Sequence, residues 1–307
     1  MKLPLVEEAI SGGCMKNRWL LWSAFFLGGT LLLFVVCVGI ATLLFGDRES
    51  LVAGEGVGLV ELKGVIVDGQ ETIRQLRDLK KDKRVKAVVL RIESPGGVVG
   101  PSQEIFSEVK RVAKVKKVVV SMGSVAASGG YYVAAPATVI FANPGTITGS
   151  IGVLMKFSNI EGLMDKVGMK AFTLKTGKFK DSGSPVRTMS PEEREILQGV
   201  IDNTHAQFVR AVAEGRRLPV EEVSRIADGR ILSGEQALAL KLVDRLGTMQ
   251  DAIEEAGRLG GIKGEPELIR PAKKKTPMFD LLAEGAAEHL GALSRAEKGL
   301  SLDYRMP

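Results

Sequence analysis

The chain has 307 residues, 45% of them hydrophobic, so it is long enough for one large domain with a full core or for two small domains. Its net charge is only +6, and its densest basic run, residues 273–275, is flanked by prolines and indicates a solvated linker rather than a nucleic-acid patch. Cys14 and Cys37 fall in or before an apolar N-terminal stretch, and there are only two histidines. We therefore expect no disulfide, no metal site and no other cofactor.

The apolar stretch, residues 19–45, contains no charged side chain and is long enough to cross the hydrocarbon core of a bilayer, about 30 Å thick, with tilt. A cleaved signal peptide is the alternative, but its apolar region is usually only about 7–15 residues long. Lys16 and Arg18 precede the stretch, and no positive excess follows it. The positive-inside rule therefore predicts a single-pass membrane protein with residues 1–18 in the cytoplasm and the large C-terminal part outside it.

After a glycine-containing linker at residues 46–56, the sequence alternates between strand and helix patterns. Strands are predicted at 57–62, 65–67, 85–92 and 118–121, and helices at 70–80, 101–113 and 126–135. This βαβ alternation indicates an α/β domain with a parallel sheet, which we place at residues 57–270.

Capping boxes predict two helix starts in the second half of the chain. Ser190-Pro191-Glu192-Glu193 begins a long helix with proline at its first position, and Ser233-Gly234-Glu235-Gln236 begins another. Residues 271–307 form a C-terminal tail whose residues 278–293 are weakly amphipathic, a pattern consistent with packing on a neighbour or with mobility. No internal duplication is present.

The most informative segment is Ser124 to Tyr132, which places Ser128 among small residues between a buried-strand pattern and a predicted helix. At a helix N-terminus, unpaired N–H groups and the positive dipole end favour developing negative charge, as an acyl-transfer nucleophile and its oxyanion require. The alternative is that Ser128 is simply a small residue at a tight helix–strand contact.

A second segment, Glu93-Ser94-Pro95-Gly96-Gly97, follows another buried-strand pattern. Its two glycines allow the backbone to approach a ligand closely, and free N–H groups there can complete an oxyanion hole.

A third segment, the polar loop at 176–185, supplies candidates for the base that a serine nucleophile needs. The pattern around His205 is that of a long amphipathic helix, and His289 falls in the tail, so neither is expected to serve. A lysine must then accept the proton, in a site dry enough to lower its pKa from about 10.4 towards neutrality. The loop offers Lys178 and Lys180.

Together these motifs resemble the signal peptide peptidase A (protease IV) family in its short, single-domain form, a family of serine–lysine peptidases with a ClpP/crotonase fold. The resemblance extends from about residue 58 to 257 and rests on five segments: Glu93–Gly97, Gly123–Tyr132, Thr148–Val153, Lys178–Asp181 and Asp228–Arg230.

The resemblance implies a role for each candidate. Ser128 would be the nucleophile and Lys180, which directly precedes an acidic residue, the general base. Ser150 would hydrogen-bond and orient that lysine, and the backbone N–H groups of Gly97 and Gly129 would form the oxyanion hole.

Two further expectations concern the base and its surroundings. Lys178 is the rival base, but the family pattern aligns on the lysine before Asp181, so we expect Lys178 to be a solvated loop residue. The resemblance also implies a homo-oligomeric ring. Within it we expect Ser128 and Lys180 to pair inside one subunit, with neighbours shaping the groove.

The function that the resemblance implies is that of a serine endopeptidase anchored in a bacterial-type inner membrane, which cleaves remnant signal peptides and other unfolded or membrane-associated peptides. One alternative is a related membrane protease that acts on an intact membrane-protein partner. Another is a crotonase-like acyl-CoA-binding module, in which Gly96 and Gly97 bind a thioester and Ser128 is structural. The apolar stretch and the combination of Ser128 with Lys180 weigh against the second alternative.

Overall fold

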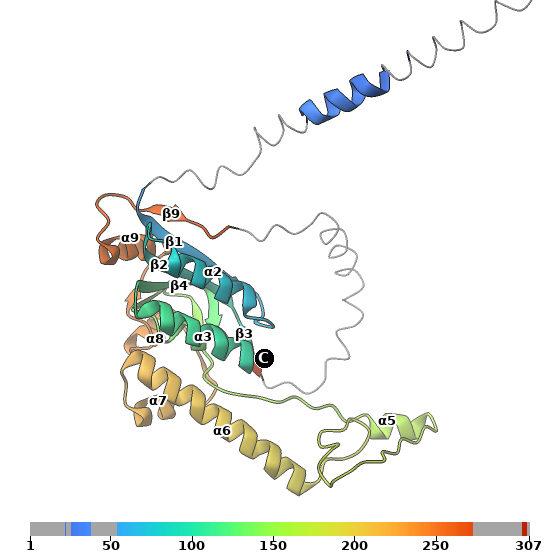
Figure 1. Ribbon diagram of the computed structural model, residues 1–307. Helices are drawn as coiled ribbons and strands as arrows, with labels where there is room; N and C mark the ends of the chain where they lie inside the picture. The colour runs from blue at the N-terminus through green and yellow to red at the C-terminus, as the bar shows by residue number, and fades with distance from the viewer. Residues whose placement is uncertain (1–21, 23–25, 38–53, 273–302, 306–307) are drawn as a thin grey trace, which may run out of the picture. The chain divides into compact units, whose positions relative to one another are not determined.

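A computed structural model describes residues 22, 26–37, 54–272 and 303–305 (Figure 1). The chain forms two compact units, Met1–Val52 and Ala53–Pro307. In the first unit, residues 26–37 are helical. Within the described ranges, no helix combines the length and the hydropathy needed to cross a membrane. Apart from these residues and Trp22, the predicted span at 19–45 lies outside the described part of the chain.

The second unit is an α/β domain built on an eight-stranded sheet. Every described pairing in this sheet is parallel except that of β6 with β7. The main order is β7-β6-β4-β2-β1-β9, and β5 pairs with the first half of β4 and with β8. The strands are β1 (Gly56–Lys63), β2 (Val85–Ser94), β4 (Lys117–Ala127), β5 (Val139–Ala142), β6 (Ile147–Gly149), β7 (Ile231–Leu232), β8 (Arg245–Leu246) and β9 (Glu267–Ile269).

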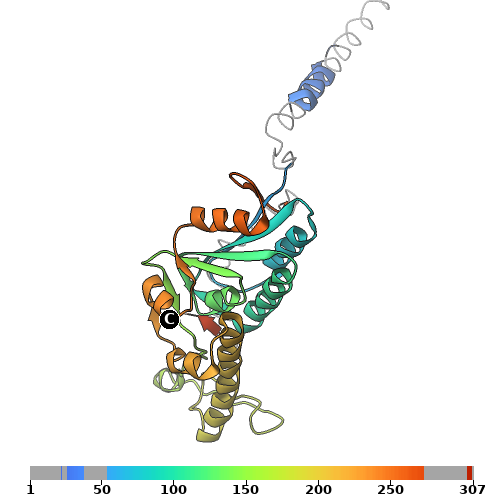
Figure 2. The same cartoon turned by 90° about the vertical axis from the view of Figure 1, so that its left-hand side faces the viewer.

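Helices cover both faces of this sheet, which is why its strands are apolar almost throughout (Figures 1 and 2). On one face, α9 (Met249–Gly260) packs its alanines against Leu59, Val89 and Val119. The residues between these, such as Leu90 and Val120, are also fully buried and point to the opposite face. That face is covered by α2 (Gln70–Lys81) and α3 (Val99–Ala113).

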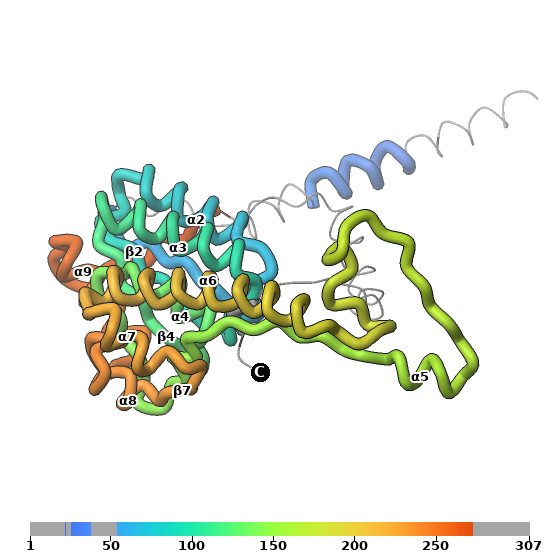
Figure 3. Tube along the Cα trace, turned by 90° about the horizontal axis from the view of Figure 1, so that it is seen from below, coloured from blue at the N-terminus to red at the C-terminus, as the bar shows by residue number. Residues whose placement is uncertain are grey.

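The remaining helices lie in the second half of the domain. They are α4 (Gly129–Ala134), α5 (Glu161–Lys166), α6 (Pro191–Arg216), α7 (Val220–Ile226) and α8 (Gly234–Ala239). Both predicted capping boxes are confirmed, with Ser190 and Glu193 capping α6 and Ser233 and Gln236 capping α8. Residues 154–190, which we call the arm, carry α5 and extend away from the sheet beyond the start of α6 (Figures 1 and 3).

Two predicted elements differ from the structure. The predicted strand at 65–67 is reduced to one bridge between Ile66 and Gly97, because only Ile66 of this run is buried. The predicted helix at 126–135 begins only at Gly129, because β4 continues to Ala127 and pairs there with β6. This extension is possible because the Glu93 carboxylate accepts hydrogen bonds from backbone N–H groups at 124 and 125.

Candidate active site

Ser128 and Ser150 lie side by side where two neighbouring parallel strands end. Ala127 of β4 and Gly149 of β6 are the last paired residues, and each serine directly follows one of them. The Ser128 N–H donates to the Gly149 carbonyl at 2.8 Å, which ties the two strand ends together. Both serines are almost fully buried, with exposed fractions of 1% and 5%. The structure therefore brings the predicted nucleophile and the predicted orienting serine together.

The backbone at Ser128 has an unusual conformation, with φ 54° and ψ −117°. A non-glycine residue in such a sparsely populated region costs on the order of 1–3 kcal/mol and persists only where the surroundings fix it. Here the N–H is held by Gly149, and the carbonyl accepts from the Tyr132 N–H at 2.8 Å in the first turn of α4. Among the described residues, the Ser128 hydroxyl itself has no hydrogen-bond partner. The backbone therefore fixes the position of Ser128, while its hydroxyl oxygen remains available to react.

The two glycines predicted for the oxyanion hole flank this serine from different elements. Gly129 is the first residue of α4, and α4 packs against β3 (Gly96–Val98), which carries Gly97. A Cβ atom on Gly97 would lie only 2.1 Å from the Ile66 carbonyl oxygen, so this close approach requires glycine. Gly96 and Val98 hydrogen-bond to Ile66. The N–H and carbonyl of Gly97 therefore point to the other edge of β3.

That other edge of β3 is occupied by a segment of the C-terminal tail. β10 (Asp303–Arg305) pairs antiparallel with β3, and residue 304 lies opposite Gly97. α4 also contacts β10. No pattern in the sequence predicts this pairing, because 303–305 contains only three residues and its partner lies about 200 positions earlier in the chain.

Ser150 is positioned by the Asp228-Gly229-Arg230 turn. The Arg230 carbonyl accepts a hydrogen bond from the Ser150 N–H at 2.8 Å, and the Gly229 N–H donates to the Ile151 carbonyl. The Arg230 side chain donates to the Asp228 carboxylate at 2.8 Å, and this hydrogen bond lowers the pKa of Asp228 to about 2. The backbone of this turn therefore fixes the position of Ser150, which gives the Asp228–Arg230 motif a structural role beside the site.

Lys180 lies in the arm, in a turn that covers residues 178–183. Its side chain is exposed and has no hydrogen-bond or ion-pair partner among the described residues. Lys178, the rival base, forms an ion pair with Glu192 and lies over the Phe179 ring at 5.4 Å. Of the two lysines, Lys180 is therefore the one whose ammonium group has no partner in the described part of the chain.

The chain does not bring Lys180 to Ser128. The lysine turn is attached to Glu192 and Glu193 in the first turn of α6. The α4 helix instead meets α6 at Phe208, whose ring lies 4.9 Å from that of Tyr132. Positions 192 and 208 are separated by about 24 Å at 1.5 Å per residue along a helix. Figures 1 and 3 show the arm directed away from α4, so the expected pairing within one subunit is not found.

The side chains of His205 and Tyr131 each contact a backbone carbonyl. The His205 Nε2 atom lies 2.7 Å from the Ala227 carbonyl oxygen, on the side of α6 that meets α7, and His289 lies outside the described residues. The buried Tyr131 hydroxyl donates to the Leu242 carbonyl at 2.8 Å, and burial raises its pKa. Neither described residue is placed as a base for Ser128.

Comparison with known proteins identifies the family to which this domain is similar. Residues 110–263 match the model of Peptidase family S49, and residues 65–146 match that of Clp protease. A Synechocystis protein named "Putative protease slr0021" is 42% identical over 76% of this chain and 84% of its own length.

Two other relatives bear more specific names. Protease 4 of Salmonella typhi is 37% identical over 68% of this chain and 35% of its own length. An Enterococcus faecium protein named "Putative signal peptide peptidase SppA" is 40% identical over 60% of this chain and 54% of its own length. The chain belongs to peptidase family S49, the signal peptide peptidase A family of serine peptidases.

Proposed function

We propose that this peptidase uses Ser128 as its nucleophile and Lys180 of a neighbouring copy as its general base, with Ser150 orienting that lysine. The observation that carries the proposal is the pair of adjacent serines at the ends of β4 and β6, of which Ser128 has a constrained backbone and a hydroxyl without a partner among the described residues. The serine oxygen attacks the scissile carbonyl while its proton passes to the neutral lysine amine. The same lysine then returns a proton to the leaving amine.

The backbone beside Ser128 supports stabilisation of the tetrahedral intermediate. Gly129 follows the nucleophile at the start of α4, and the N–H of Gly97 points towards the outer edge of β3. Two such N–H groups, fixed before the reaction begins, stabilise the negative charge that develops on the carbonyl oxygen.

The edge of β3 supports the assignment of an extended peptide as substrate. A segment of this chain, β10, already lies antiparallel on that edge opposite Gly97. A substrate that added a strand at the same place would gain main-chain hydrogen bonds and place its carbonyl group near the oxyanion glycines.

The arm supports the assignment of a second copy as the source of the base. Its large apolar side chains are unusually exposed, with fractions of 61% for Leu163, 87% for Phe172 and 92% for Leu174. An exposed apolar surface of this kind marks an interaction site. If the arm covers the neighbour's β4–β6 edge, it delivers Lys180 to Ser128 and excludes the water that a lysine base must avoid. Repeated head-to-tail contacts of this type form a ring when the rotation between successive copies closes, which is the assembly we propose here.

Anchoring and substrate choice complete the proposal. The apolar residues 19–45 would hold the chain in the membrane with its N-terminus in the cytoplasm and the peptidase unit outside. Such a site would receive remnant signal peptides and other unfolded or membrane-associated peptides, and the name of the Enterococcus relative supports this. The alternative is a related protease that cleaves an intact membrane-protein partner. Cleavage rates for folded and unfolded substrates distinguish the two functions, because only the alternative predicts efficient cleavage of a folded protein.

A mixing experiment tests the shared site. Ser128→Ala and Lys180→Ala chains, each inactive alone, are co-expressed with different affinity tags and the mixed assemblies are purified through both tags. With random mixing, about one site in four combines an intact Ser128 with a neighbour's Lys180, so about a quarter of wild-type activity should return. Mixed assemblies as inactive as each parent would show that the base is not supplied by a neighbour.

A further inference from the structure

The turn that carries Lys180 has little regular backbone structure of its own. It is stabilised by hydrogen bonds from the Ser182 N–H to the Phe179 carbonyl at 3.2 Å and from the Ser184 N–H to the Asp181 carbonyl at 3.0 Å. Such a turn holds a side chain poorly, because few backbone hydrogen bonds and few buried apolar contacts oppose its local opening. The position of the lysine must therefore be fixed by side chains around the turn.

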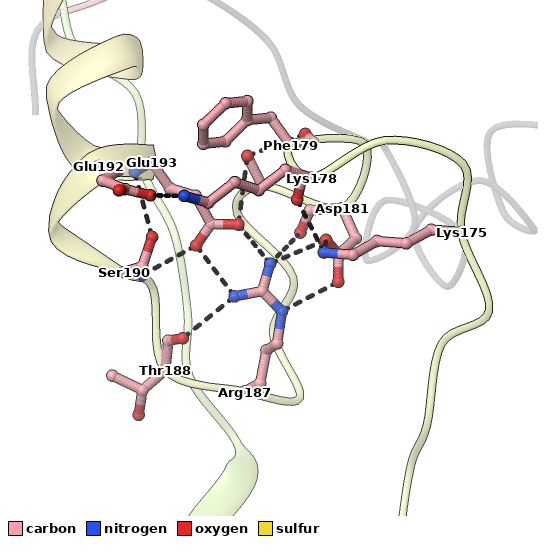
Figure 4. Close-up of polar contacts among 10 residues, drawn as sticks. Lys175, Lys178, Phe179, Asp181, Arg187, Thr188, Ser190, Glu192 and Glu193 are labelled. Atoms are coloured by element: carbon pink, nitrogen blue, oxygen red, sulfur yellow. Dashed lines mark hydrogen bonds and ion pairs between the residues drawn. The ribbon is translucent and has the colours of Figure 1, made fainter.

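Arg187 makes most of the side-chain contacts that stabilise this turn (Figure 4). Its guanidinium donates to both carboxylate oxygens of Asp181, each at 2.9 Å, and to the Asp181 carbonyl at 3.2 Å. It also donates to both carboxylate oxygens of Glu193, with the longer contact at 2.9 Å, and to the Thr188 carbonyl at 3.2 Å. One side chain thus connects the residue next to Lys180 with the first turn of α6.

The other residues of the turn reinforce this clamp. Lys175 forms an ion pair with Asp181, and Lys178 with Glu192, while the Ser182 hydroxyl lies 3.3 Å from the Glu193 carboxylate. Glu193 is itself fixed, because it completes the capping box of α6 with Ser190. Among the described residues, the three acids of this cluster and its two other lysines each have a charged partner, whereas Lys180 has none.

We propose that Arg187 is a positioning residue for Lys180: by clamping Asp181 to Glu193, it holds the turn so that the lysine is presented to the Ser128 of a neighbouring copy. This role rests on the proposed function, in which Lys180 is the base. Arginine suits the task because its planar fork binds two carboxylates at once, which a lysine ammonium cannot do.

The clamp also sets the charge beside the base. Hydrogen bonds from Arg187, followed by those from Lys175, hold the pKa of Asp181 well below its usual range. The hydrogen bond from Arg187 and one from the Ser190 N–H lower the pKa of Glu193 to about 2. Both acids are therefore ionised at neutral pH, and Arg187 neutralises part of the negative charge beside the lysine.

Arg187→Gln in the full-length chain tests the role, with kcat per active site measured after titration of Ser128 by a serine-directed covalent probe. We expect kcat to fall by on the order of tenfold to a hundredfold, since a misplacement of about 1 Å has an effect of that size. KM should change little. Arg74→Gln is the matched control, because Arg74 also bridges two carboxylates, Glu71 and Asp78, on the distant helix α2.

The pH–rate profile separates positioning from a purely structural role. In Arg187→Gln, the rise of the rate with pH should occur at higher pH than in the wild type, because carboxylates without a neighbouring cation favour the protonated form of an amine. Asp181→Asn should move this rise to lower pH, and Arg187→Lys should lower kcat while leaving the rise near its wild-type position. If Arg187 and Asp181 act as one clamp, the fold-loss of kcat in the Arg187→Gln/Asp181→Asn double variant should be smaller than the product of the two single fold-losses.

The outcomes distinguish this inference from the function on which it rests. Full activity in Lys180→Ala would overturn the base assignment and with it any role of Arg187 through that base. An inactive Lys180→Ala together with wild-type kcat and pH profile in Arg187→Gln would overturn only the positioning role. If Arg187→Gln fails to assemble in light scattering, Arg187→Lys and Asp181→Asn decide the question, and equal wild-type behaviour of both would overturn the proposal.

Discussion

Ser128 and Ser150 share one structural relationship: each lies one residue beyond the last pair of two adjacent parallel strands, and each has a positive φ, 54° and 51°. Positive φ is uncommon for residues other than glycine. Its occurrence at both members of one adjacent pair indicates that the chain must turn sharply as it leaves the sheet there. The strain is located where two hydroxyl groups are held side by side at the strand ends.

The strain at Ser128 predicts an unusual order of stability among inactive variants. Glycine normally destabilises a regular element by roughly 0.5–1 kcal/mol relative to alanine, but it adopts the Ser128 backbone conformation without strain. We therefore expect Ser128→Gly to be at least as stable as Ser128→Ala, and more stable by about 1 kcal/mol if the strain is fully relieved. Denaturation of both variants at one protein concentration measures the difference.

The matched control is Ser107 in α3, where both substitutions remove the same hydrogen bond to the Gln103 carbonyl. There the ordinary order should hold, with the alanine variant more stable by about 1 kcal/mol. If alanine were also clearly the more stable residue at position 128, the backbone there would not be strained.

Local patterns predicted much of the fold because they act within a few residues. The apolar runs of β1 and β2 and the capping boxes at Ser190 and Ser233 are signals of this kind, and the structure contains these strands and caps. The end of β4 was missed because its extension to Ala127 depends on the Glu93 carboxylate from the neighbouring strand. The pairing of β10 with β3 depends on residues about 200 positions apart, which no local pattern contains.

The candidate site divides in the same way. The motifs placed Ser128 and Gly97 just after buried-strand patterns, and parallel strands end at one edge of a sheet, so the meeting of these two segments follows from the fold. Ser150 entered only through the family resemblance, because no strand was predicted before it. The location of Lys180 does not follow, because it depends on the length of α6 and on how the arm leaves the sheet. No sequence pattern pointed to Arg187, because its role depends on contacts with both Asp181 and Glu193 that appear only in the folded chain.

The turn that holds Ser150 predicts an effect of Asp228 on the rate. Asp228→Ala removes the carboxylate that accepts from the Arg230 N–H at 3.1 Å and from its side chain, and the Arg230 carbonyl is the acceptor for Ser150. We expect kcat to fall by about tenfold, since the serine would orient the lysine less well, while KM changes little. Peptide hydrolysis under steady-state conditions measures both.

The chain contains a close copy of this turn at a distance from the site. The Asp82 carboxylate accepts from the Arg84 N–H at 2.9 Å and from the Arg84 side chain, at the opposite ends of the strands. Asp82→Ala should therefore leave kcat unchanged. A similar loss of rate in both variants would mean that Asp228 acts through general stability and not through Ser150.

The Arg187 cluster predicts a specific pH dependence of stability. The pKa of Glu193 is lowered to about 2, first by Arg187, whereas a glutamate in the unfolded chain has a pKa of about 4.3. Between these values the unfolded chain binds a proton that the folded chain does not. The contribution of Glu193 is thus complete above about pH 4.3 and is lost as the pH falls towards 2.

Glu193→Gln should make the unfolding free energy less dependent on pH in this window, because glutamine keeps a capping acceptor but does not titrate. Thermal or chemical denaturation at several pH values between about 5 and 2 measures the slope. Glu192→Gln, with its half-exposed side chain one residue earlier, is the control and should keep the wild-type slope. An unchanged slope in Glu193→Gln would show that this carboxylate is not specially stabilised in the folded chain.

The pairing of β10 with β3 predicts that the C-terminal end competes with peptides for the strand opposite Gly97. A segment tethered to the same chain has an effective concentration that can reach the millimolar range, so it raises the apparent KM for a substrate that needs this edge.

Deletion of residues 303–307 should therefore lower KM for a short peptide several-fold and leave kcat unchanged. Tyr304→Pro should have the same effect at full length, because proline has no N–H to donate to the paired strand. Steady-state kinetics with one peptide across the three chains measures this. A KM that stays at the wild-type value in both variants would show that peptides do not bind along β3.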